Sequence, residues 1–315
     1  MVSVSIIMSV YNTKEEYLRE AIDSILNQSF SSFEFIIVDD ASNDETKKIL
    51  SSYSDERIRM IKNDVNHGLT YNLNRTLEVS SGKYIARMDA DDVAHPDRIE
   101  RQVRYMEENE EVNILGSYMN CGGTIRTYWD DKPWEYRKVA LLFENIGLGH
   151  PSVMFRKSFL DEHKLKYDET MKKSQDFELW TRCIEYTNLY VYPECLMDYR
   201  IHDGQISTAL SSEQQACIKE IKRRQLNKFR TYLSQSDIDL FSQPDETSSA
   251  KLSDYRRIMR AIIKANDIEK KYNSDILKYV LRRKYRIYLN YHYLNLYRIE
   301  KYIVWPLMGY GIVNV

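Results

Sequence analysis

The first hundred residues alternate between two hydrophobic patterns, one typical of strands and the other of helices. Val2 to Val10 and Phe33 to Val38 are nearly continuous apolar runs, as in strands buried on both faces. Between them, Leu18, Ile22 and Ile25 recur at helical spacing and form one apolar stripe. The sequence therefore predicts a buried strand, an amphipathic helix and a second buried strand.

The alternation continues along the chain. It predicts a short strand at Ile58 to Ile61, a helix over Thr70 to Ser80 and a strand over Tyr84 to Met88. Pro96 suits the first turn of the next helix, where its missing N–H group costs nothing. Because strands and helices alternate at this pace, we expect right-handed crossovers and an α/β fold with a mostly parallel sheet.

Two of the predicted helices begin with the pattern of a capping box. Thr13 with Glu16, and Ser42 with Glu45, have the Ser/Thr-x-x-Glu spacing that lets the two residues satisfy each other's backbone N–H groups. The second of these helices is expected to run to about Tyr53.

Polar residues gather where the predicted strands end. In parallel sheets, ligands bind beyond the carboxyl ends of the strands, so these residues are the first candidates for a site. They are Tyr11 and Asn12, Asp39 and Asp40, Asn63 to Gly68, and Asp89 to Asp92.

The pattern changes twice in the remainder of the chain. Asn113 to Arg200 mixes short strands with one clear helix from about Asp176 to Tyr186, and helices dominate beyond Ser207. We therefore expect one domain over residues 1–207 and a helical C-terminal region over residues 208–315.

Composition limits the classes of function. Basic and acidic residues number 45 and 47, so the net charge of -2 gives no global reason to expect nucleic acid binding. Four cysteines without metal-like spacing are typical of a reducing compartment. The chain opens without a signal-peptide pattern and holds no run of about 18 apolar residues, so we expect a cytoplasmic protein.

Glycine-rich phosphate motifs are absent. The turn after the first strand, Tyr11 to Glu15, contains no glycine, whereas dinucleotide-binding folds place G-x-G-x-x-G there. No G-x-x-x-x-G-K-[ST] occurs either. The sequence argues against NAD as a cofactor and excludes a P-loop.

An acidic cluster, Asp89-Ala90-Asp91-Asp92, follows the fourth predicted strand. In an extended segment Asp89 and Asp91 point to the same side, where their charges repel unless a cation intervenes. Carboxylates suit Mg²⁺ or Mn²⁺ shared with substrate phosphates. The alternative is a solvated acidic loop that caps the next helix.

A set of ordered motifs resembles the family 2 glycosyltransferases over Ser3 to Ser207. The motifs are Val4 to Tyr11, Asp39-Asp40 followed by Ala41-Ser42, Gly82 to Asp92, and Pro96-Asp97-Arg98. The resemblance implies a GT-A fold, a divalent metal (Mn²⁺ or Mg²⁺), and inverting transfer from a sugar nucleotide, usually a UDP-sugar. It divides residues 1–207 into a nucleotide-sugar half, to about residue 110, and an acceptor half.

The same resemblance implies roles for residues at the strand ends. Asp40 would contact the uracil edge, with Asp39 as a near alternative, and Asp91 would hold the metal that bridges the diphosphate. The competing interpretations are that the Asp39-Asp40 pair only caps a helix and that Tyr11 is a core residue. The residues implied in donor binding are Ser9, Tyr11, Asp39, Asp40, Asn66, Gly68, Asp89, toward the ribose, and Ala90, with Asp92 assisting through water.

Asp176 matches the position of the general base in the resemblance. It lies near the start of a predicted helix and off the apolar stripe that holds Phe177 and Trp180. Gln175 stands where relatives commonly carry the first acid of a Glu-Asp pair. The alternative is that Asp176 only caps the helix or answers its dipole.

The stretch Asp198 to Ser207 resembles a Tyr-Arg-x-His motif that closes the site in relatives. It implies that Arg200 meets the diphosphate as a donor-binding residue and that His202 ligates the metal. A lone histidine is as well explained as a surface or packing residue.

The C-terminal tail combines basic and aromatic residues. Between Lys278 and Lys301 the only acid is Glu300, and tyrosines are interleaved with lysines and arginines. This pattern favours contact with an anionic inner-membrane surface. A hairpin packed on the catalytic domain and a homodimer seam are the alternatives.

Together these features predict an enzyme that moves a sugar from a UDP-sugar to a hydroxyl of a glycan or lipid-linked acceptor by single displacement. Two other classes remain open. A nucleotidyltransferase acting on sugar phosphates would need a glycine-rich, basic loop after the first strand, which is missing. A non-catalytic nucleotide-sugar binding protein would have no use for both Asp91 and Asp176.

Overall fold

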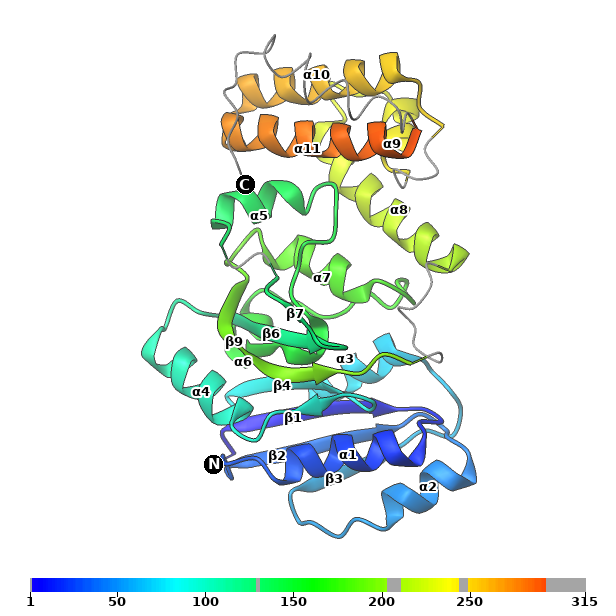
Figure 1. Cartoon of the computed structure of the whole chain (residues 1–315), viewed down its shortest axis with the longest axis vertical. Coiled ribbons are helices and arrows are strands. Elements are labelled where there is room, and N and C mark those ends of the chain that lie inside the picture. Colours follow the sequence, from blue (N-terminus) through cyan, green and yellow to red (C-terminus); the bar gives the residue numbers. More distant parts are fainter. Residues whose placement is uncertain (1, 129–130, 203–210, 244–248, 293–315) are drawn as a thin grey trace. The chain divides into compact units, whose positions relative to one another are not determined.

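The computed structural model describes residues 2–128, 131–202, 211–243 and 249–292, apart from the side chain of Tyr291 (Figure 1). The chain forms two compact units. The first unit comprises Met1–Leu141 and Asn145–Cys217, and the second comprises Leu142–Glu144 and Ile218–Val315. The expected domain boundary at Ser207 lies outside the described residues.

The first unit is built on one sheet with the strand order β3-β2-β1-β4-β8-β6-β9-β5, and β7 pairs with β6. The first four strands are parallel, as the apolar runs predict, whereas β8 is antiparallel to both of its neighbours. The strands are β1 (Val4–Val10), β2 (Phe33–Asp39), β3 (Ile58–Lys62), β4 (Tyr84–Asp89), β5 (Val93–Ala94), β6 (Ile114–Cys121), β7 (Thr124–Arg126), β8 (Met154–Arg156) and β9 (Tyr190–Tyr199).

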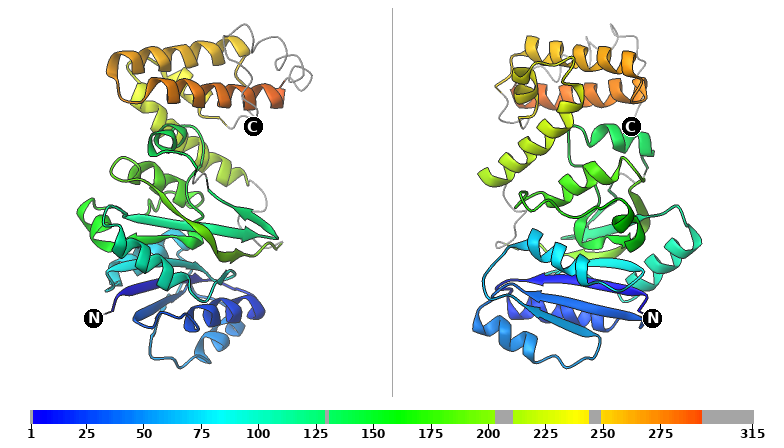
Figure 2. Two further views of the ribbon diagram at one scale, coloured as in Figure 1. Left: turned by 60° about the vertical axis from the view of Figure 1, so that its left-hand side comes forward. Right: turned by 180° about the vertical axis from the view of Figure 1, so that it is seen from behind.

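Helices cover both faces of this sheet (Figures 1 and 2). Leu18 and Ile22 of α1 pack with Ile6 and Met8 of β1, while α3 lies on the opposite face, where its Asn72 donates to Ser9. The mixed α/β architecture that the sequence predicts is confirmed. The helices of this unit are α1 (Glu15–Leu26), α2 (Asp44–Ser51), α3 (Leu69–Val79), α4 (Arg98–Glu108), α5 (Trp134–Ala140), η1 (His150–Ser152), α6 (Lys157–Glu162) and α7 (Gln175–Cys183).

Register places the ends of the central strands together. Ser9 of β1 pairs with Val38 of β2 on one side and with Asp89 of β4 on the other. The carboxyl ends of these strands therefore meet at one edge of the sheet, where Asp39, Asp40 and the acidic cluster begin.

Both predicted capping boxes are wrong. Helix α1 begins after Lys14 without a side-chain cap, and the cap of α2 is Asn43, whose side chain accepts from the Thr46 N–H group. Ser42 is not available as a cap because its hydroxyl accepts from the Asn12 N–H group (3.2 Å). Pro96 also lies outside the helix that it was expected to start, since α4 begins at Arg98 after Asp97.

The second unit is helical, as expected. Its two longest helices, α10 and α11, pair side by side (Figure 2), and the rings of Tyr255 and Tyr288 stack with centroids 4.3 Å apart. Among the helices that the structure describes, none combines the length and apolarity needed to cross a bilayer. The remaining helices are α8 (Ser212–Leu226), which spans the division between the units, η2 (Asn227–Phe229), α9 (Gln235–Phe241), α10 (Leu252–Glu269) and α11 (Ser274–His292).

Candidate active site

A cavity of about 930 Å³ opens at the carboxyl edge of the sheet. Its walls come from the ends of β1, β2 and β4, the segment before α3, and the loop before α7. Asp39, Asp176 and Arg200 are not among its lining residues. The predicted site residues that line it are Ser9, Tyr11, Asp40, Asn66, Gly68, Asp89, Ala90, Asp91 and His202.

Asp40 and Asp39 have different surroundings. The buried Asp40 carboxylate accepts from the Asn63 amide (2.7 Å) and from the backbone N–H groups of His67 (2.9 Å) and Gly68 (2.8 Å). Asp39 instead accepts from the Ser42 N–H group (3.0 Å) and borders a smaller hollow between α2 and β3. Only Asp40 thus faces the main cavity.

Aromatic rings flank Asp40. Tyr11 is 53% exposed and lines the cavity, so it is not a core residue. The rings of His67 and Tyr71 stack with centroids 4.3 Å apart and also line the cavity. Sequence reasoning missed this pair, although His67 lies inside the loop that was expected at the site. The glycine at position 68 has φ of 85°, a conformation that other residues rarely adopt.

The acidic cluster brings three carboxylates together. Atoms of Asp89, Asp91 and Asp92 lie within 4.8 Å of one another. The expectation that an extended segment aligns Asp89 with Asp91 is wrong, because β4 ends at Asp89 and a turn carries Asp91. Asp92 is fully buried: its Oδ1 accepts from the Arg200 N–H group (3.0 Å), and its Oδ2 has no hydrogen-bond partner among the described residues.

Electrostatics make this cluster unfavourable without a cation. Burial, followed by the charges of Asp89 and Asp91, raises the pKa of Asp92 to about 8. Burial and the charge of Asp89 also raise the pKa of Asp91, against an opposing effect of His202. Clustered carboxylates with an unpartnered buried oxygen fit a hard divalent cation such as Mg²⁺ or Mn²⁺.

Two buried arginines lie beneath the cluster. Arg87 is 2% exposed and forms an ion pair with Asp89, and Arg98 donates to the Arg87 carbonyl oxygen (2.8 Å). Burial, followed by the charge of Arg87, lowers the pKa of Arg98 to about 9. Sequence reasoning missed both roles, although both residues lie within the quoted motifs. They offset part of the negative charge of the cluster.

The end of β9 braces the acidic turn. Arg200 Nε donates to the Asp91 carbonyl oxygen (2.9 Å), and its guanidinium group contacts Glu20 and lies 4.4 Å from the Tyr17 ring centroid. Arg200 therefore contacts both the acidic turn and α1, and its role at a diphosphate stays a prediction. His202 does face the cavity, with Nε2 3.0 Å from Asp91 Oδ2.

Asp176 is the second residue of α7. Its side chain keeps some exposed surface, but its carboxyl group is deeply surrounded. Burial raises its pKa, whereas the N–H groups of Phe177 and of Asp176 itself, the positive charge of Arg87 and the side chain of Asn145 lower it. Arg87 thus acts electrostatically on both the acidic cluster and Asp176.

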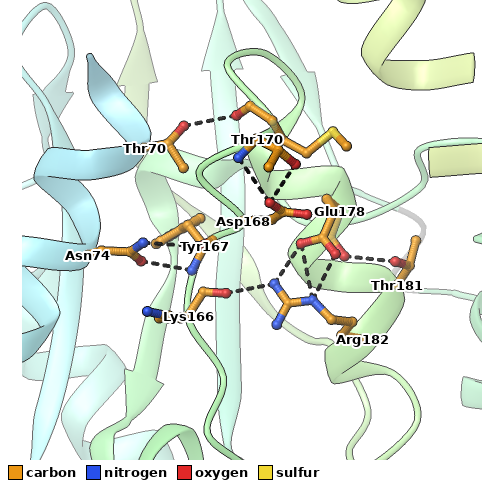
Figure 3. Close-up of polar contacts among 10 residues, drawn as sticks. Thr70, Asn74, Lys166, Tyr167, Asp168, Thr170, Glu178, Thr181 and Arg182 are labelled. Atoms are coloured by element: carbon orange, nitrogen blue, oxygen red, sulfur yellow. Dashed lines mark hydrogen bonds and ion pairs between the residues drawn. The ribbon is translucent and has the colours of Figure 1, made fainter. Parts of the chain in front are cut away.

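The loop before α7 is clamped from two sides (Figure 3). From α3, the Asn74 side chain donates to the Tyr167 carbonyl oxygen and accepts from its N–H group (both 2.9 Å), and Thr70 donates to the Met171 carbonyl oxygen (2.9 Å). From α7, Arg182 donates to the Lys166 carbonyl oxygen (2.6 Å). The loop carries Glu169, Lys172 and Lys173 to the cavity wall, three lining residues that sequence reasoning missed.

Comparisons with known proteins agree with this arrangement. The family model of glycosyl transferase family 2 matches residues 5–164. An uncharacterized glycosyltransferase of Haemophilus influenzae is 35% identical over 251 residues, which cover 75% of this chain and 76% of that protein. The putative glycosyltransferase EpsE of Bacillus subtilis is 32% identical over 186 residues, which cover 58% of this chain and 66% of EpsE.

Solved structures extend the likeness to the fold. TarS of S. aureus, in complex with UDP-GlcNAc, has a TM-score of 0.63 at 18% identity and covers 96% of this chain and 93% of its own. The mannosyltransferase PcManGT of Pyrobaculum calidifontis, in complex with GDP-Man and Mn²⁺, has a TM-score of 0.53 at 12% identity and covers 93% and 87%. The cavity, the acidic cluster and these likenesses lead to one conclusion: the chain belongs to glycosyl transferase family 2 and is a glycosyltransferase with a GT-A fold.

Proposed function

We propose that this enzyme transfers a sugar from a UDP-sugar to a hydroxyl group of a glycan or lipid-linked acceptor, with inversion and with a divalent metal. The observation that carries the proposal is that an acidic cluster lines the cavity and that Arg87 is close enough to this cluster and to Asp176 to act electrostatically on both. One end of the site is thus suited to a diphosphate and the other to an incoming hydroxyl group. The nucleotidyltransferase and the non-catalytic alternatives lose support, because the relatives are glycosyltransferases.

The uridine would bind at the Asp40 end of the cavity. Asp40 already accepts three hydrogen bonds that fix its orientation, and its Oδ2 keeps acceptor capacity for the N–H group of a uracil edge. Tyr11 and the stacked pair His67 and Tyr71 offer aromatic faces to the ring. The fold neighbour TarS with UDP-GlcNAc supports uridine as the base.

The metal would be held by Asp91, with Asp89, Asp92 and His202 in its immediate surroundings. A bound divalent cation neutralises charge that gathers on the departing diphosphate. Arg200 donates to the acidic turn and the buried Arg98 to the end of β4, so we assign them to positioning rather than to the donor itself. The Mn²⁺ complex of PcManGT supports this choice of cofactor class.

Asp176 would accept the proton of the acceptor hydroxyl group. An alcohol is a weak nucleophile until a base takes its proton, and the sugar C1 passes through an oxocarbenium-like state. The helix N–H groups and Arg87 help to keep Asp176 ionised against the effect of burial. One base opposite the leaving group gives a single displacement, with no need for a carboxylate nucleophile.

The experiment that tests this function is a donor screen. The purified protein is incubated with a panel of UDP- and GDP-sugars in Mg²⁺ or Mn²⁺, and nucleotide release is measured with and without glycan acceptors. We expect release from one UDP-sugar, dependent on the metal and stimulated by an acceptor. Release that is unaffected by a chelator would contradict the metal assignment, and no release from any donor would contradict the function.

We further propose that the helical unit contacts an anionic membrane surface. Arg256, Arg260 and Lys264 are all exposed and follow one another at intervals of four along α10, so they share one face. Arg256 donates to the Tyr285 hydroxyl group (2.8 Å), which connects this face to α11. No acidic residue occurs within 255–266 or 276–292. Of the basic tail, residues 293–301 lie outside the described part of the chain.

A further inference from the structure

Lys172 and Lys173 belong to the loop before α7, which is clamped between α3 and α7 (Figure 3). Both line the cavity. Neither ammonium group has an ion pair or a hydrogen bond with any residue that the structure describes, although acids outnumber bases in this unit. Lys172 is exposed and Lys173 half-buried, so both are accessible to a ligand that supplies negative charge.

The loop fixes the place of these lysines. The hydrogen bonds from Thr70 and Asn74 hold the backbone just before them, and α7 begins just after them. Since consecutive Cα atoms are 3.8 Å apart, the Cα atom of Lys173 lies within about 11 Å of that of Asp176. The two lysines and the proposed base therefore lie on neighbouring parts of the loop and the helix.

We propose that Lys172 and Lys173 form an anion-binding subsite for the acceptor, which carries a phosphate or carboxylate close to the reacting hydroxyl group. The inference rests on the proposed function, because it takes Asp176 as the base that the acceptor approaches. In the proposed site the acidic cluster would serve the donor diphosphate. The lysines line the same cavity, on the loop that leads to α7 and Asp176, and we assign them to the acceptor.

The donor diphosphate could supply the same negative charge as the acceptor. Two measurements distinguish these two anions. In the first, UDP binding with Mg²⁺ is titrated by calorimetry for the wild type and for Lys172→Gln/Lys173→Gln. We expect less than a twofold change in affinity. A loss of tenfold or more would move the lysines to the donor diphosphate and overturn the proposal.

The second measurement uses a probe that needs no turnover. Lysines carrying ¹³C-methyl groups are followed by NMR with saturating UDP and Mg²⁺ while methyl phosphate, or methanol as its neutral match, is added. We expect saturable shifts of the two resonances that the single variants Lys172→Gln and Lys173→Gln remove, with methyl phosphate only. Shifts caused by UDP alone, or none at all, would contradict an acceptor subsite.

Kinetics then test the role in transfer. UDP release is compared for hexoses and their 6-phosphates as acceptors, and we expect the wild type to favour the phosphates by about tenfold in kcat/KM, the worth of one charge-assisted hydrogen bond. The double glutamine variant should lose this preference and Lys172→Arg/Lys173→Arg should restore it. Lys166→Gln is the matched control, because Lys166 lies on the same loop but does not line the cavity.

The outcomes distinguish the two proposals. If no donor releases UDP under any condition, the proposed function fails, and the NMR titration still decides whether an anion binds at the lysines. If transfer occurs equally well to neutral and phosphorylated acceptors, the glycosyltransferase proposal stands and the acceptor subsite is wrong.

Discussion

The two units of this protein have opposite charges, which the whole-chain value of -2 conceals. The catalytic unit has 25 basic and 36 acidic residues, whereas the helical unit has 20 basic and 11 acidic residues. The catalytic unit has a cluster of three carboxylates, two of which line the cavity. The helical unit presents Arg256, Arg260 and Lys264 along one face of α10, with Asp267 at the end of that face. The comparison teaches that net charge is informative only once it is divided by domain, because the charges of the two units nearly cancel in the whole chain.

The largest expected effect concerns the acidic cluster of the catalytic unit. Asp91→Ala removes the carboxylate that meets His202, and we expect metal-dependent turnover to fall by more than about 10³-fold, the worth of several kcal/mol of charge stabilisation. Nucleotide release measured across a Mg²⁺ titration checks this. Glu194→Gln, at an exposed acid on the same unit that does not line the cavity, is the control. Undiminished turnover would exclude Asp91 as the metal ligand.

The next effect separates transfer from binding within the same unit. Asp176→Asn keeps the shape of the side chain but removes the proton acceptor, so we expect transfer to fall by about 10³-fold with UDP affinity nearly unchanged. Single-turnover transfer and calorimetric UDP binding measure the two quantities. Retained transfer would eliminate Asp176 as the base.

A smaller effect is expected from the basic residues of the helical unit, whose replacement should leave turnover unchanged. Neutralising Arg256, Arg260 and Lys264 together with glutamine should weaken binding to anionic vesicles by about 10²-fold, at about 1 kcal/mol for each charge. Turnover on a soluble acceptor should not change. Vesicle sedimentation at low salt provides the measurement.

A matched variant tests whether position or only net charge matters in that experiment. Lys219, Lys251 and Lys270 are three exposed lysines of the same unit, and their replacement by glutamine changes the net charge equally. We expect these changes to have little effect on vesicle binding. Equal weakening in both variants would contradict a specific face, and a concentration-dependent change in mass would favour the homodimer seam instead.

The raised pKa of Asp92 predicts how metal affinity depends on pH. Because a proton competes with the cation for a carboxylate whose pKa is about 8, affinity for Mg²⁺ should rise about tenfold for each pH unit up to about pH 8 and then level off. Calorimetry over pH 6 to 9 measures the slope. Asp92→Asn should flatten it, and a slope that persists in this variant would assign the proton to another group.

The smallest effect concerns the stability of the helical unit. Tyr288 is buried and its hydroxyl group donates to the Ala250 carbonyl oxygen (2.5 Å), so Tyr288→Phe should lower the free energy of unfolding by about 1 kcal/mol. Denaturant titration checks this value, and turnover should remain at the wild-type level. A loss of turnover would mean that the helical unit also contributes to catalysis, which the comparison of the two units does not predict.

Sequence predicted the fold well because buried parallel strands leave continuous apolar runs, and these do not depend on distant residues. Helix starts were predicted poorly because their polar side chains have several partners to choose from. The sequence predicts Ser42 as a helix cap, but its hydroxyl group accepts a hydrogen bond from the N–H group of Asn12, thirty residues earlier in the chain.

Residues of the candidate site were likewise predictable only where they did not depend on distant partners. Residues at strand ends, such as Asp40 and Asp91, were predictable from the sheet topology alone. Arg87 and Arg98 were not, because a buried arginine looks like a surface residue until its partners are known. Tyr17 contacts Arg200 from α1, a pairing across most of the catalytic unit that no local pattern indicates.

Helix α3 links two parts of the catalytic unit through two side chains that are two residues apart and therefore point to different sides of the helix. Asn72 reaches Ser9 on the donor strand, and Asn74 holds the Tyr167 backbone in the loop that leads to α7. An exchange of this loop for that of a relative must therefore also supply a partner for the Tyr167 backbone, because the loop otherwise loses two hydrogen bonds. The position of the loop before α7 is thus set in part by a residue 93 positions earlier in the chain.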